Sequence, residues 1–370
     1  MEGAADDLPD TQVAGAMMKV LLLTRYGRLG ASSRLRSLQF LPWLSAAGLD
    51  CTFQPLFSDE LLSAKYNAGS YSAKGIFAAY GARVAQLLRR RDFDLVCIEK
   101  EALPWFPASV EKLLLRGMPY VLDYDDAVFH NYDLHPRSLV RRLLGRRIDR
   151  LMASASLVTA GNDYLAQRAR DAGACRTEII PTVIDLERYT PKAGYDAAVP
   201  TIVWIGSPST VRYLSGIAQP LAELATRCKF RMRVIGGRID LPGVDVDYVP
   251  WTERGEVASI MSCDIGVMPL DDSPWERGKC GYKLVQYMAC GLPVVASPIE
   301  VNTEIVREGV NGYLANNAAV WIARLEGLLS NATLRAQMGR AGRRMVEEKY
   351  CVQVVAPRLA GLLRQVKNEQ

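Results

Sequence analysis

Residues 264–304 constrain the fold more than any other stretch, because apolar runs, a polar loop and a helical pattern follow one another there in a fixed order. Residues 264–269 form an apolar run closed by a proline, which indicates a buried strand. Residues 270–279 are polar and are expected to form a loop, and helical spacing of apolar residues begins near Gly281. Residues 293–296 supply the next apolar run. This order predicts a strand, a loop, a helix and a strand of a parallel α/β sheet.

The loop and the helix start of this stretch have the features of a phosphate-binding site. Gly278 and Gly281 let a ligand approach the backbone closely. Free backbone N–H groups and the positive end of the helix dipole favour an anion at a helix start. Lys279 and Lys283 flank that start and add positive charge. The alternative is an ordinary strand–helix–strand unit without a ligand.

Residues 279–297 (KCGYKLVQYMACGLPVVAS) resemble the nucleotide-sugar motif of the family 4 retaining glycosyltransferases, which have the two-domain GT-B fold. That motif usually reads E-x7-E followed by A-M-A-x-G-x-P-V-V-A. Gly281 matches its internal glycine, Gln286 stands at the second glutamate and Gly278 at the first, with Glu276 as a candidate substitute. The resemblance implies donor binding by six residues: Lys279, Cys280, Gly281, Tyr282, Lys283 and Gln286.

Composition agrees with a soluble two-domain enzyme. The 370 residues are 49% hydrophobic and 23% charged, and each half is long enough to bury a core. The eight cysteines are dispersed without a C-x-x-C, which argues against a zinc site or a disulfide framework and favours a reducing cytoplasm. No apolar run reaches the ~18 residues of a membrane span. Residues 1–17 lack the basic start of a secretion signal and are expected to be a disordered tail.

Strand and helix signals alternate through the first half of the chain. Strands are expected at residues 19–24, 51–55, 94–98, 120–123, 157–159 and 178–180, and helices near residues 74–90 and 104–116. Ligands of such sheets bind beyond the carboxyl ends of the strands. The loop after the first strand contains Gly30 and resembles the GT-B loop that faces the donor diphosphate and the acceptor. A simple tight turn is the alternative.

Residues 120–129 (YVLDYDDAVF) carry an acidic cluster at the end of one of these strands. In related enzymes the strand often ends in a His-Asp pair at the reaction centre, and Asp125 and Asp126 align with that pair. Such a carboxylate can orient the acceptor hydroxyl or help to remove its proton. Binding of a divalent metal, helix capping and structural pairing with arginines stay open as alternatives.

Residues 136–150 form the most basic segment, with six arginines against one aspartate. The spacing predicts one amphipathic helix with Val140, Leu143, Leu144, Ile148 and Leu151 on its apolar face. Two interpretations remain, a surface helix packed on the sheet or a patch that rests on an anionic membrane surface.

The second half repeats the alternation. Strands are expected at residues 201–205, 231–235 and 246–251, with helices beyond residue 317 and a terminal helix over residues 350–367.

The loop after residue 205 resembles the family's G-R-x-x-x-x-K-G segment. Gly206 matches the glycine, Ser207 replaces the arginine, and Arg212 aligns with the lysine, where its guanidinium can hold phosphate. Trp251 can stack on a nucleotide base or simply fill the core. Glu304 is expected to open a helix, in a segment that resembles E-I-V-x-x-G-x-N-G-x-L, and the resemblance implies that Glu304 also binds the donor.

Taken whole, the resemblance implies a GT-B enzyme with two doubly wound, Rossmann-like domains that face a cleft. The domains are expected at residues 18–192 and 198–351, with residues 352–370 as a helix that crosses back to the first. The implied activity is retaining transfer of a sugar from a UDP- or GDP-linked donor to a hydroxyl acceptor, lipid-linked or polysaccharide, in bacterial surface glycan synthesis. Asp125, Asp126, Arg212 and Lys283 are the expected catalytic residues, and no metal or other cofactor is required. An epimerase of the same fold and a catalytically silent nucleotide-sugar-binding homologue are the alternatives, whereas nucleic acid is not expected as a partner.

Overall fold

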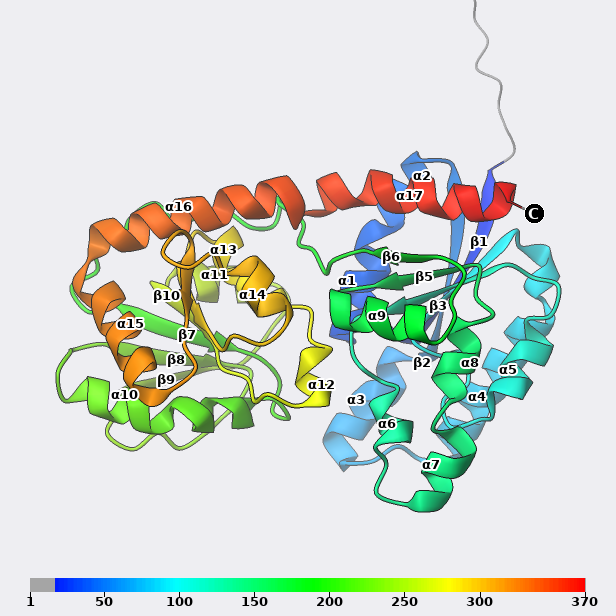
Figure 1. The fold of residues 1–370 in the computed structure, drawn as a ribbon, viewed down its shortest axis with the longest axis horizontal. Helices are drawn as coiled ribbons and strands as arrows, with labels where there is room; N and C mark the ends of the chain where they lie inside the picture. The colour runs from blue at the N-terminus through cyan, green and yellow to red at the C-terminus, as the bar shows by residue number, and fades with distance from the viewer. Residues whose placement is uncertain (1–16, 370) are drawn as a thin grey trace, which may run out of the picture.

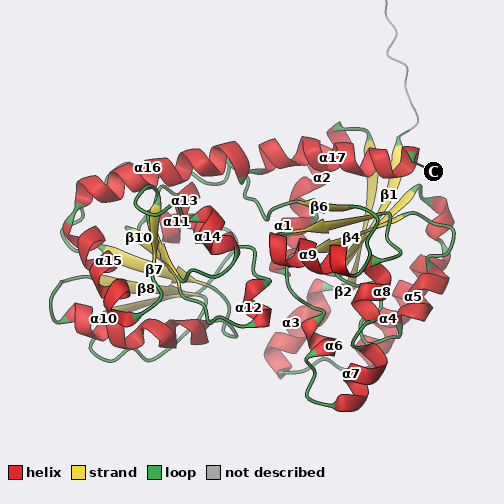
Figure 2. Cartoon of the chain, viewed as in Figure 1, coloured by secondary structure: helices red, strands yellow, loops and turns green. Residues whose placement is uncertain are grey.

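The computed structural model describes residues 17–369, except for the side chains of residues 66 and 67. The tail expected over residues 1–17 therefore lies, apart from Met17, outside the described residues. Within that range the chain forms two parallel six-stranded sheets with helices on their faces (Figures 1 and 2).

The first sheet has the strand order β2-β1-β3-β4-β5-β6, and every pair is parallel. Its strands are β1 (Met18–Tyr26), β2 (Leu49–Phe57), β3 (Leu95–Glu99), β4 (Tyr120–Tyr124), β5 (Leu157–Ala160) and β6 (Thr177–Ile179). Apolar runs such as Leu21–Leu23 are buried on both faces of the sheet, which is why these strands lack polar alternation. All six expected strands of the first half are confirmed.

Helices and 3-10 turns cover this sheet: α1 (Ala31–Arg36), η1 (Leu38–Phe40), α2 (Leu41–Ala46), α3 (Asp59–Ala68), α4 (Ala73–Leu88), η2 (Arg90–Asp92), α5 (Ala108–Leu114), α6 (His130–Asp133), α7 (Ser138–Leu144), α8 (Arg147–Met152) and α9 (Asp163–Asp171). Side chains cap several of them. Asn162, for example, accepts a hydrogen bond from the Leu165 N–H at the start of α9.

The second sheet has the order β12-β11-β10-β7-β8-β9 and is also parallel throughout. Its strands are β7 (Thr201–Ile205), β8 (Arg231–Ile235), β9 (Val246–Val249), β10 (Ile265–Met268), β11 (Val294–Ala296) and β12 (Gly312–Leu314). Its flanking elements are η3 (Val211–Ile217), α10 (Ala218–Ala225), α11 (Glu256–Met261), α12 (Pro274–Arg277), α13 (Tyr282–Ala289), α14 (Val301–Ile305) and α15 (Ala318–Ser330).

The last two helices tie the domains together. α16 (Ala332–Lys349) lies on the second domain and α17 (Val352–Asn368) runs back along the first, as the red end of the ribbon in Figure 1 shows. Val352, Val355 and Leu363 of α17 share one buried cluster with Val20 of β1. The expected crossing helix is thus confirmed, and its apolar stripe completes the core of the first domain.

Three local predictions are wrong. The expected loop over residues 270–279 contains the short helix α12, because Ser273-Pro274 is a favourable helix start. Glu304 does not open a helix, since α14 begins at Val301. The segment of residues 136–150 is two helices, α7 and α8, that meet at Gly145.

The break at Gly145 also changes what the basic segment does. Leu143 is exposed, whereas Ile148 is buried, so the predicted apolar face is not continuous. Arg147 is buried and forms ion pairs with Glu101 and Glu111. One of the six arginines is therefore a structural residue of the core, and the exposed basic surface is carried by the other five.

Candidate active site

Three strands of the first sheet deliver polar side chains to one edge. Because β3 and β4 pair in parallel with Glu99 opposite Asp123, the residues that follow them leave the sheet side by side. Lys100 follows β3 directly, and Asp125 and Asp126 follow β4. The loop after β1 leads into α1, which contributes Ser32. The carboxyl ends of the strands thus build a charged cluster, at the edge where open α/β sheets bind ligands.

Asp125 is held in place by fixed partners within the first domain. Its Oδ2 accepts a hydrogen bond from Ser32 Oγ at 2.6 Å, and its Oδ1 lies 2.9 Å from Lys100 Nζ. Burial by itself would raise the pKa of this carboxyl, but the charges of Lys100 and Arg36 outweigh it and hold the pKa at about 2. Asp125 is therefore an anchor of the site that is ionised at neutral pH.

Asp126 is the carboxylate that both domains share. Its Oδ2 lies 3.4 Å from Lys100 Nζ of the first domain, and its Oδ1 lies 2.7 Å from Lys279 Nζ of the second. Its side chain keeps 25% exposure, so Asp126 is the more accessible of the two aspartates. The prediction that Asp125 and Asp126 lie together at a strand end facing the other domain agrees with this geometry; their catalytic role stays a prediction.

Lys100 is the residue of this cluster that sequence reasoning missed. It lies in the left-handed region of backbone space at φ 64°, uncommon for a residue with a long side chain, and it is buried. Strained backbone of this kind persists where the surroundings fix it, and it is concentrated at functional sites. The available signal was its position: a lysine between Glu99 and Glu101, immediately beyond the carboxyl end of a central strand.

The start of α13 provides the cationic half of the site. Gly281 has φ 64°, and a Cβ there would lie 2.4 Å from Ile305 Cδ1, so both backbone and packing require glycine. Lys283 lies in the first turn of α13, half-buried, with Nζ 5.7 Å from the centroid of the Trp204 ring. Among the described residues no carboxylate is within ion-pair distance of it. Burial and the neighbouring Lys279 ammonium lower the pKa of Lys283 to about 8.

Gly278 replaces the family's first glutamate for a visible reason. A Cβ on Gly278 would lie 2.6 Å from both the backbone N and the Cβ of Ala127, in the loop that follows Asp126. The loop that carries Asp125 and Asp126 in the first domain therefore packs directly on the Gly278–Gly281 loop of the second. Glu276, the candidate substitute, is buried and accepts hydrogen bonds from Tyr213 and Ser273, so its carboxylate is engaged inside the second domain.

The side chains of Gln286 and Tyr282 point away from Lys283. Both contact Tyr189, which lies in the segment between the two sheets. Gln286 Nε2 donates to Tyr189 Oη at 2.9 Å, and the Tyr282 hydroxyl lies 3.3 Å from the same oxygen. Tyr189 donates in turn to Glu256, which also accepts from the Trp251 indole N–H at 2.9 Å. This buried chain holds the linker, α11 and α13 in one arrangement.

Trp251 packs against the core of the second domain and also reaches the domain interface. It is half-buried, and the guanidinium of Arg34, on α1, lies 5.2 Å from its ring centroid. One face of the indole thus contacts a cation of the first domain.

The loop after β7 is compact and stabilised by its own hydroxyls. Gly206 is close-packed, since a Cβ there would lie 2.4 Å from the Trp204 ring. Ser207 Oγ lies 2.8 Å from Ser209 Oγ, and the Ser207 N–H donates to Thr210 Oγ1. Arg212 is exposed, with its guanidinium 5.2 Å from the Tyr213 ring centroid and 3.7 Å from Glu276. In the described part of the chain, no hydrogen bond or ion pair links Arg212 to Lys283.

The remaining predicted residues have mainly packing roles. Gly30 precedes α1, where a Cβ would lie 2.3 Å from Tyr26 Cβ. Cys280 is buried at the domain interface and donates from Sγ to the Asp125 carbonyl at 3.1 Å. Glu304 is exposed on α14, where burial and the like charges of Asp163 and Glu300 raise its pKa. Within residues 17–369, no hydrogen bond or ion pair links Glu304 to Lys279 or Lys283.

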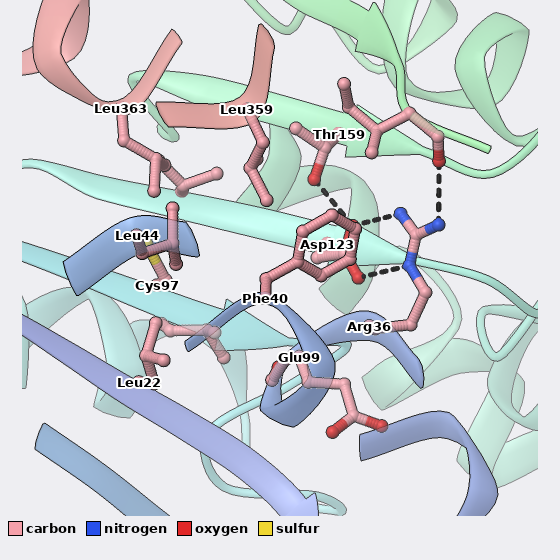
Figure 3. Close-up of a pocket in the computed structure, with 14 residues that line it drawn as sticks. Leu22, Arg36, Phe40, Leu44, Cys97, Glu99, Asp123, Thr159, Leu359 and Leu363 are labelled. Carbon is pink, nitrogen blue, oxygen red and sulfur yellow. Dashed lines mark hydrogen bonds and ion pairs between the residues drawn. The ribbon is translucent and has the colours of Figure 1, made fainter. Parts of the chain in front are cut away.

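A buried ion pair supports the acidic loop from behind (Figure 3). Arg36 of α1 pairs with Asp123 at 2.5 Å and donates to the Ile180 carbonyl, and Thr159 Oγ1 also donates to Asp123. These groups line a small cavity of about 40 Å³ that Leu359 of α17 helps to close. α17 thus contributes to the support of the cleft edge.

An open cavity of about 510 Å³ lies where both domains and their linker meet. It is lined by Arg28, Arg188, Glu253, Arg254 and Val257. Arg28 and Glu253 form an ion pair across the domains at 2.9 Å. The size matches ligand pockets, and three guanidinium groups against one carboxylate favour an anionic occupant.

No helix within residues 17–369 is both long and apolar enough to span a bilayer. In the same residues, no three His, Cys, Asp or Glu side chains are grouped so that they could hold a metal ion.

Comparison with known proteins covers both domains. Residues 55–188 match the model of the Glycosyltransferase Family 4 domain, and residues 199–331 match that of Glycosyl transferases group 1. Over 75 residues the chain is 36% identical to spore coat protein SA of Bacillus subtilis, a match that spans a fifth of the chain and a fifth of that relative.

Solved structures share the whole architecture. Sucrose-phosphate synthase from Thermosynechococcus elongatus superimposes with a TM-score of 0.72 at 16% identity, over 95% of this chain and all of that one. HepE of Anabaena in complex with UDP superimposes with a TM-score of 0.69 at 16% identity, over 94% of this chain and all of that one. At such identity the likeness shows the fold alone. With both domain models matched and the GT-B architecture complete, the chain belongs to the family 4 glycosyltransferases.

Proposed function

We infer that this protein is a retaining glycosyltransferase that moves a sugar from a nucleotide diphosphate donor to a hydroxyl acceptor in surface glycan synthesis. The donor binds mainly to the second domain, with its diphosphate at the start of α13 and its sugar toward Asp126. HepE of Anabaena binds UDP and UDP-glucose, which supports a uridine donor as the first to test.

The single observation that carries this proposal is Lys283. A half-buried ammonium without a carboxylate partner is costly, and its lowered pKa reports that cost. A diphosphate at the adjacent helix start supplies the missing counter-charge and also accepts hydrogen bonds from free backbone N–H groups. Lys279 lies next to Gly281 at the same helix start and adds a second charge.

The positions of the negative charges support retention of configuration. Asp125 is bound to Lys100 and Ser32, so it is poorly placed to serve as a free nucleophile. The leaving diphosphate, on the same face as the departing bond, is then the base available to the acceptor hydroxyl. Lys279 and Lys283 stabilise the charge that develops on this leaving group.

The test is binding of UDP, GDP and ADP, each measured by thermal unfolding and by calorimetry. A nucleotide at 100 times its Kd stabilises the folded state by about 2.7 kcal/mol. We expect a shift with one nucleotide, loss of that shift in Lys283→Ala, and its retention in Lys229→Ala, which removes an exposed lysine of the same domain. A wild-type protein that binds none of the three would refute the proposal. The anomeric configuration of the product, read by NMR, tests retention.

We also infer that α7 rests on an anionic membrane surface where a lipid-linked acceptor is found. Leu139 and Leu143 of α7 are 64% and 63% exposed, and the exposed Arg137, Arg141 and Arg142 belong to the same segment. Exposed apolar side chains beside arginines are typical of helices that lie in the lipid headgroup region.

Co-sedimentation with phosphatidylcholine vesicles, with and without phosphatidylglycerol, tests this interpretation. The wild type should pellet only with the anionic vesicles, and Leu139→Ser/Leu143→Ser should stay in solution. Leu113→Ser is the matched control, because this leucine of α5 is 67% exposed. Equal pelleting of all three proteins would remove α7 from the membrane contact.

A nucleotide-sugar-binding protein without transfer is the second candidate. The observation in its favour is Gly278, where the packing of Ala127 leaves no room for the family's glutamate. Retained nucleotide binding without product, across a panel of acceptors, would favour this candidate over the transferase. An epimerase would instead convert its donor without any acceptor.

A further inference from the structure

Asp126 lies between an ammonium of each domain, and the two ammonium groups are held very differently. We propose that Lys100 positions Asp126 for the acceptor, and that the donor diphosphate draws Lys279 away from this carboxylate so that the acceptor site is completed only after the donor has bound. This proposal rests on the transferase function inferred above.

Lys100 is a fixed partner. Its side chain is 7% exposed, and its Nζ contacts Asp125 at 2.9 Å as well as Asp126 at 3.4 Å. Its backbone N–H donates to the Asp123 carbonyl at 2.8 Å, which pins the left-handed turn in place. Moving this lysine would leave two carboxylates without their shared counter-charge, so Lys100 stays where it is.

Lys279 is an exchangeable partner. Its side chain is 24% exposed, and Asp126 is its only carboxylate within ion-pair distance among the described residues. Its Nζ also lies 5.5 Å from the Trp275 ring centroid, so the ammonium has a neutral aromatic neighbour besides Asp126. Lysine is a compact charge on a flexible stem, suited to such a change of partner.

The donor provides the competing charge. A diphosphate at the start of α13 lies beside Lys279 as well as Lys283, and it carries more negative charge than one carboxylate. Lys279 therefore moves to the diphosphate when the donor is present. This movement also breaks an ion pair between the domains, so the donor replaces one contact across the cleft by another.

The exchange changes what Asp126 can do. Without the donor both of its oxygens are engaged, Oδ1 with Lys279 and Oδ2 with Lys100. With the donor bound, Oδ1 is free to accept a hydrogen bond from the acceptor hydroxyl while Lys100 still holds Oδ2. The acceptor hydroxyl is then oriented only in the presence of the sugar that it attacks, which gives ordered binding with the donor first.

The decisive variant is Asp126→Asn, titrated with UDP, GDP and ADP by calorimetry. If Lys279 must leave Asp126 to bind phosphate, removing the carboxylate charge should tighten nucleotide binding, roughly fivefold for a partly exposed ion pair. Lys279→Met should weaken binding, and Asp126→Asn/Lys279→Met should show no gain over Lys279→Met. Asp240→Asn, an exposed aspartate of the second domain, is the control and should bind as the wild type does.

Kinetics separate the two lysines. Lys100→Met should leave the nucleotide Kd within a factor of two but raise the acceptor KM roughly tenfold or lower kcat to the same extent. Lys100→Arg should restore part of the loss, and Lys112→Met, an exposed lysine of α5, should behave as the wild type. If Lys100→Met does not fold, Lys100→Arg tests the role of Lys100. Asp126→Asn still decides whether Lys279 exchanges partners, because the Asp126 carboxylate is partly exposed.

The outcomes are distinguishable. Nucleotide binding by the wild type with unchanged or weaker binding by Asp126→Asn overturns the exchange but leaves the transferase standing. Lys100→Met that weakens nucleotide binding as much as Lys279→Met does would place Lys100 in the donor site and overturn its positioning role. No nucleotide binding by the wild type overturns the transferase, and the exchange with it.

Discussion

Each edge of the cleft carries a lysine with restricted access to solvent, but only the lysine of the first domain has carboxylate partners. On the first domain, Lys100 and Asp125 neutralise each other within one buried cluster. On the second, Lys283 has no carboxylate partner among the described residues and relies on what enters the cleft. The first edge is therefore organised before any ligand arrives, whereas the second becomes electrostatically complete only with an anion bound.

This contrast predicts that the largest loss of stability comes from the first edge. Asp125→Asn leaves the buried Lys100 with one carboxylate partner instead of two and should lower the free energy of unfolding by roughly 3 kcal/mol. Urea unfolding followed by circular dichroism measures it. A loss as small as that of Asp240→Asn would show that the cluster is not organised by its ion pair.

Acid unfolding sharpens the same point. The pKa of Asp125 is depressed in the folded state. Its contribution to the free energy of unfolding is therefore present at neutral pH and is lost as the pH falls from about 4 through about 2. The wild type should lose about 2 kcal/mol over this window from Asp125 alone. Asp125→Asn should lack this part of the pH dependence. Parallel acid profiles of the two proteins would contradict it.

For the second edge, we expect stability to depend on pH in the opposite direction. The pKa of Lys283 is lowered to about 8 in the folded protein, so folding opposes its charge, and stability should increase as the pH rises from about 8 toward 10.5. Lys283→Met should therefore raise Tm at pH 7 without nucleotide, by ~2–4 °C if the partly exposed charge costs ~1 kcal/mol. Scanning calorimetry measures this. A lower Tm in Lys283→Met would mean that the lysine stabilises the empty protein.

Nucleotide binding should follow the same titration. The anion favours the charged lysine, so affinity should fall as the pH rises above about 8, and Lys283→Met should lose that dependence. Calorimetric titrations with UDP between pH 7 and 9.5 test this. Equal slopes in both proteins would assign the pH dependence to another group.

The smallest effect concerns the contact between the two edges. Gly278→Ala puts a Cβ 2.6 Å from the backbone N of Ala127, so the loops must separate slightly. We expect unchanged nucleotide affinity and a roughly fivefold lower transfer rate, which corresponds to ~1 kcal/mol of overpacking. Gly216→Ala, where a Cβ meets nothing within 4 Å, is the control. A transfer rate equal to that of the control would show that the contact is not needed in the reaction.

The sequence by itself determined the architecture. Continuous apolar runs such as residues 19–24 and 201–205 are typical of strands buried on both faces, and their alternation with helical spacing favours a parallel sheet. The predicted phosphate-binding loop could also be recognised in the sequence, because Gly278, Lys279, Gly281 and Lys283 lie close together along the chain.

Tertiary structure decided which side chains meet at the first edge, and which partners several residues of the predicted motifs have. Lys100 belongs to the site because it pairs with Asp125 and Asp126, which the β3–β4 register brings beside it. Gln286 was expected to bind the donor, but the fold places its amide against Tyr189. Arg147 was expected on the basic face of a surface helix, but the fold places it against Glu101 and Glu111. Local periodicity records which face of an element is buried, but partners distant in sequence depend on sheet order and domain packing, which no single stretch encodes.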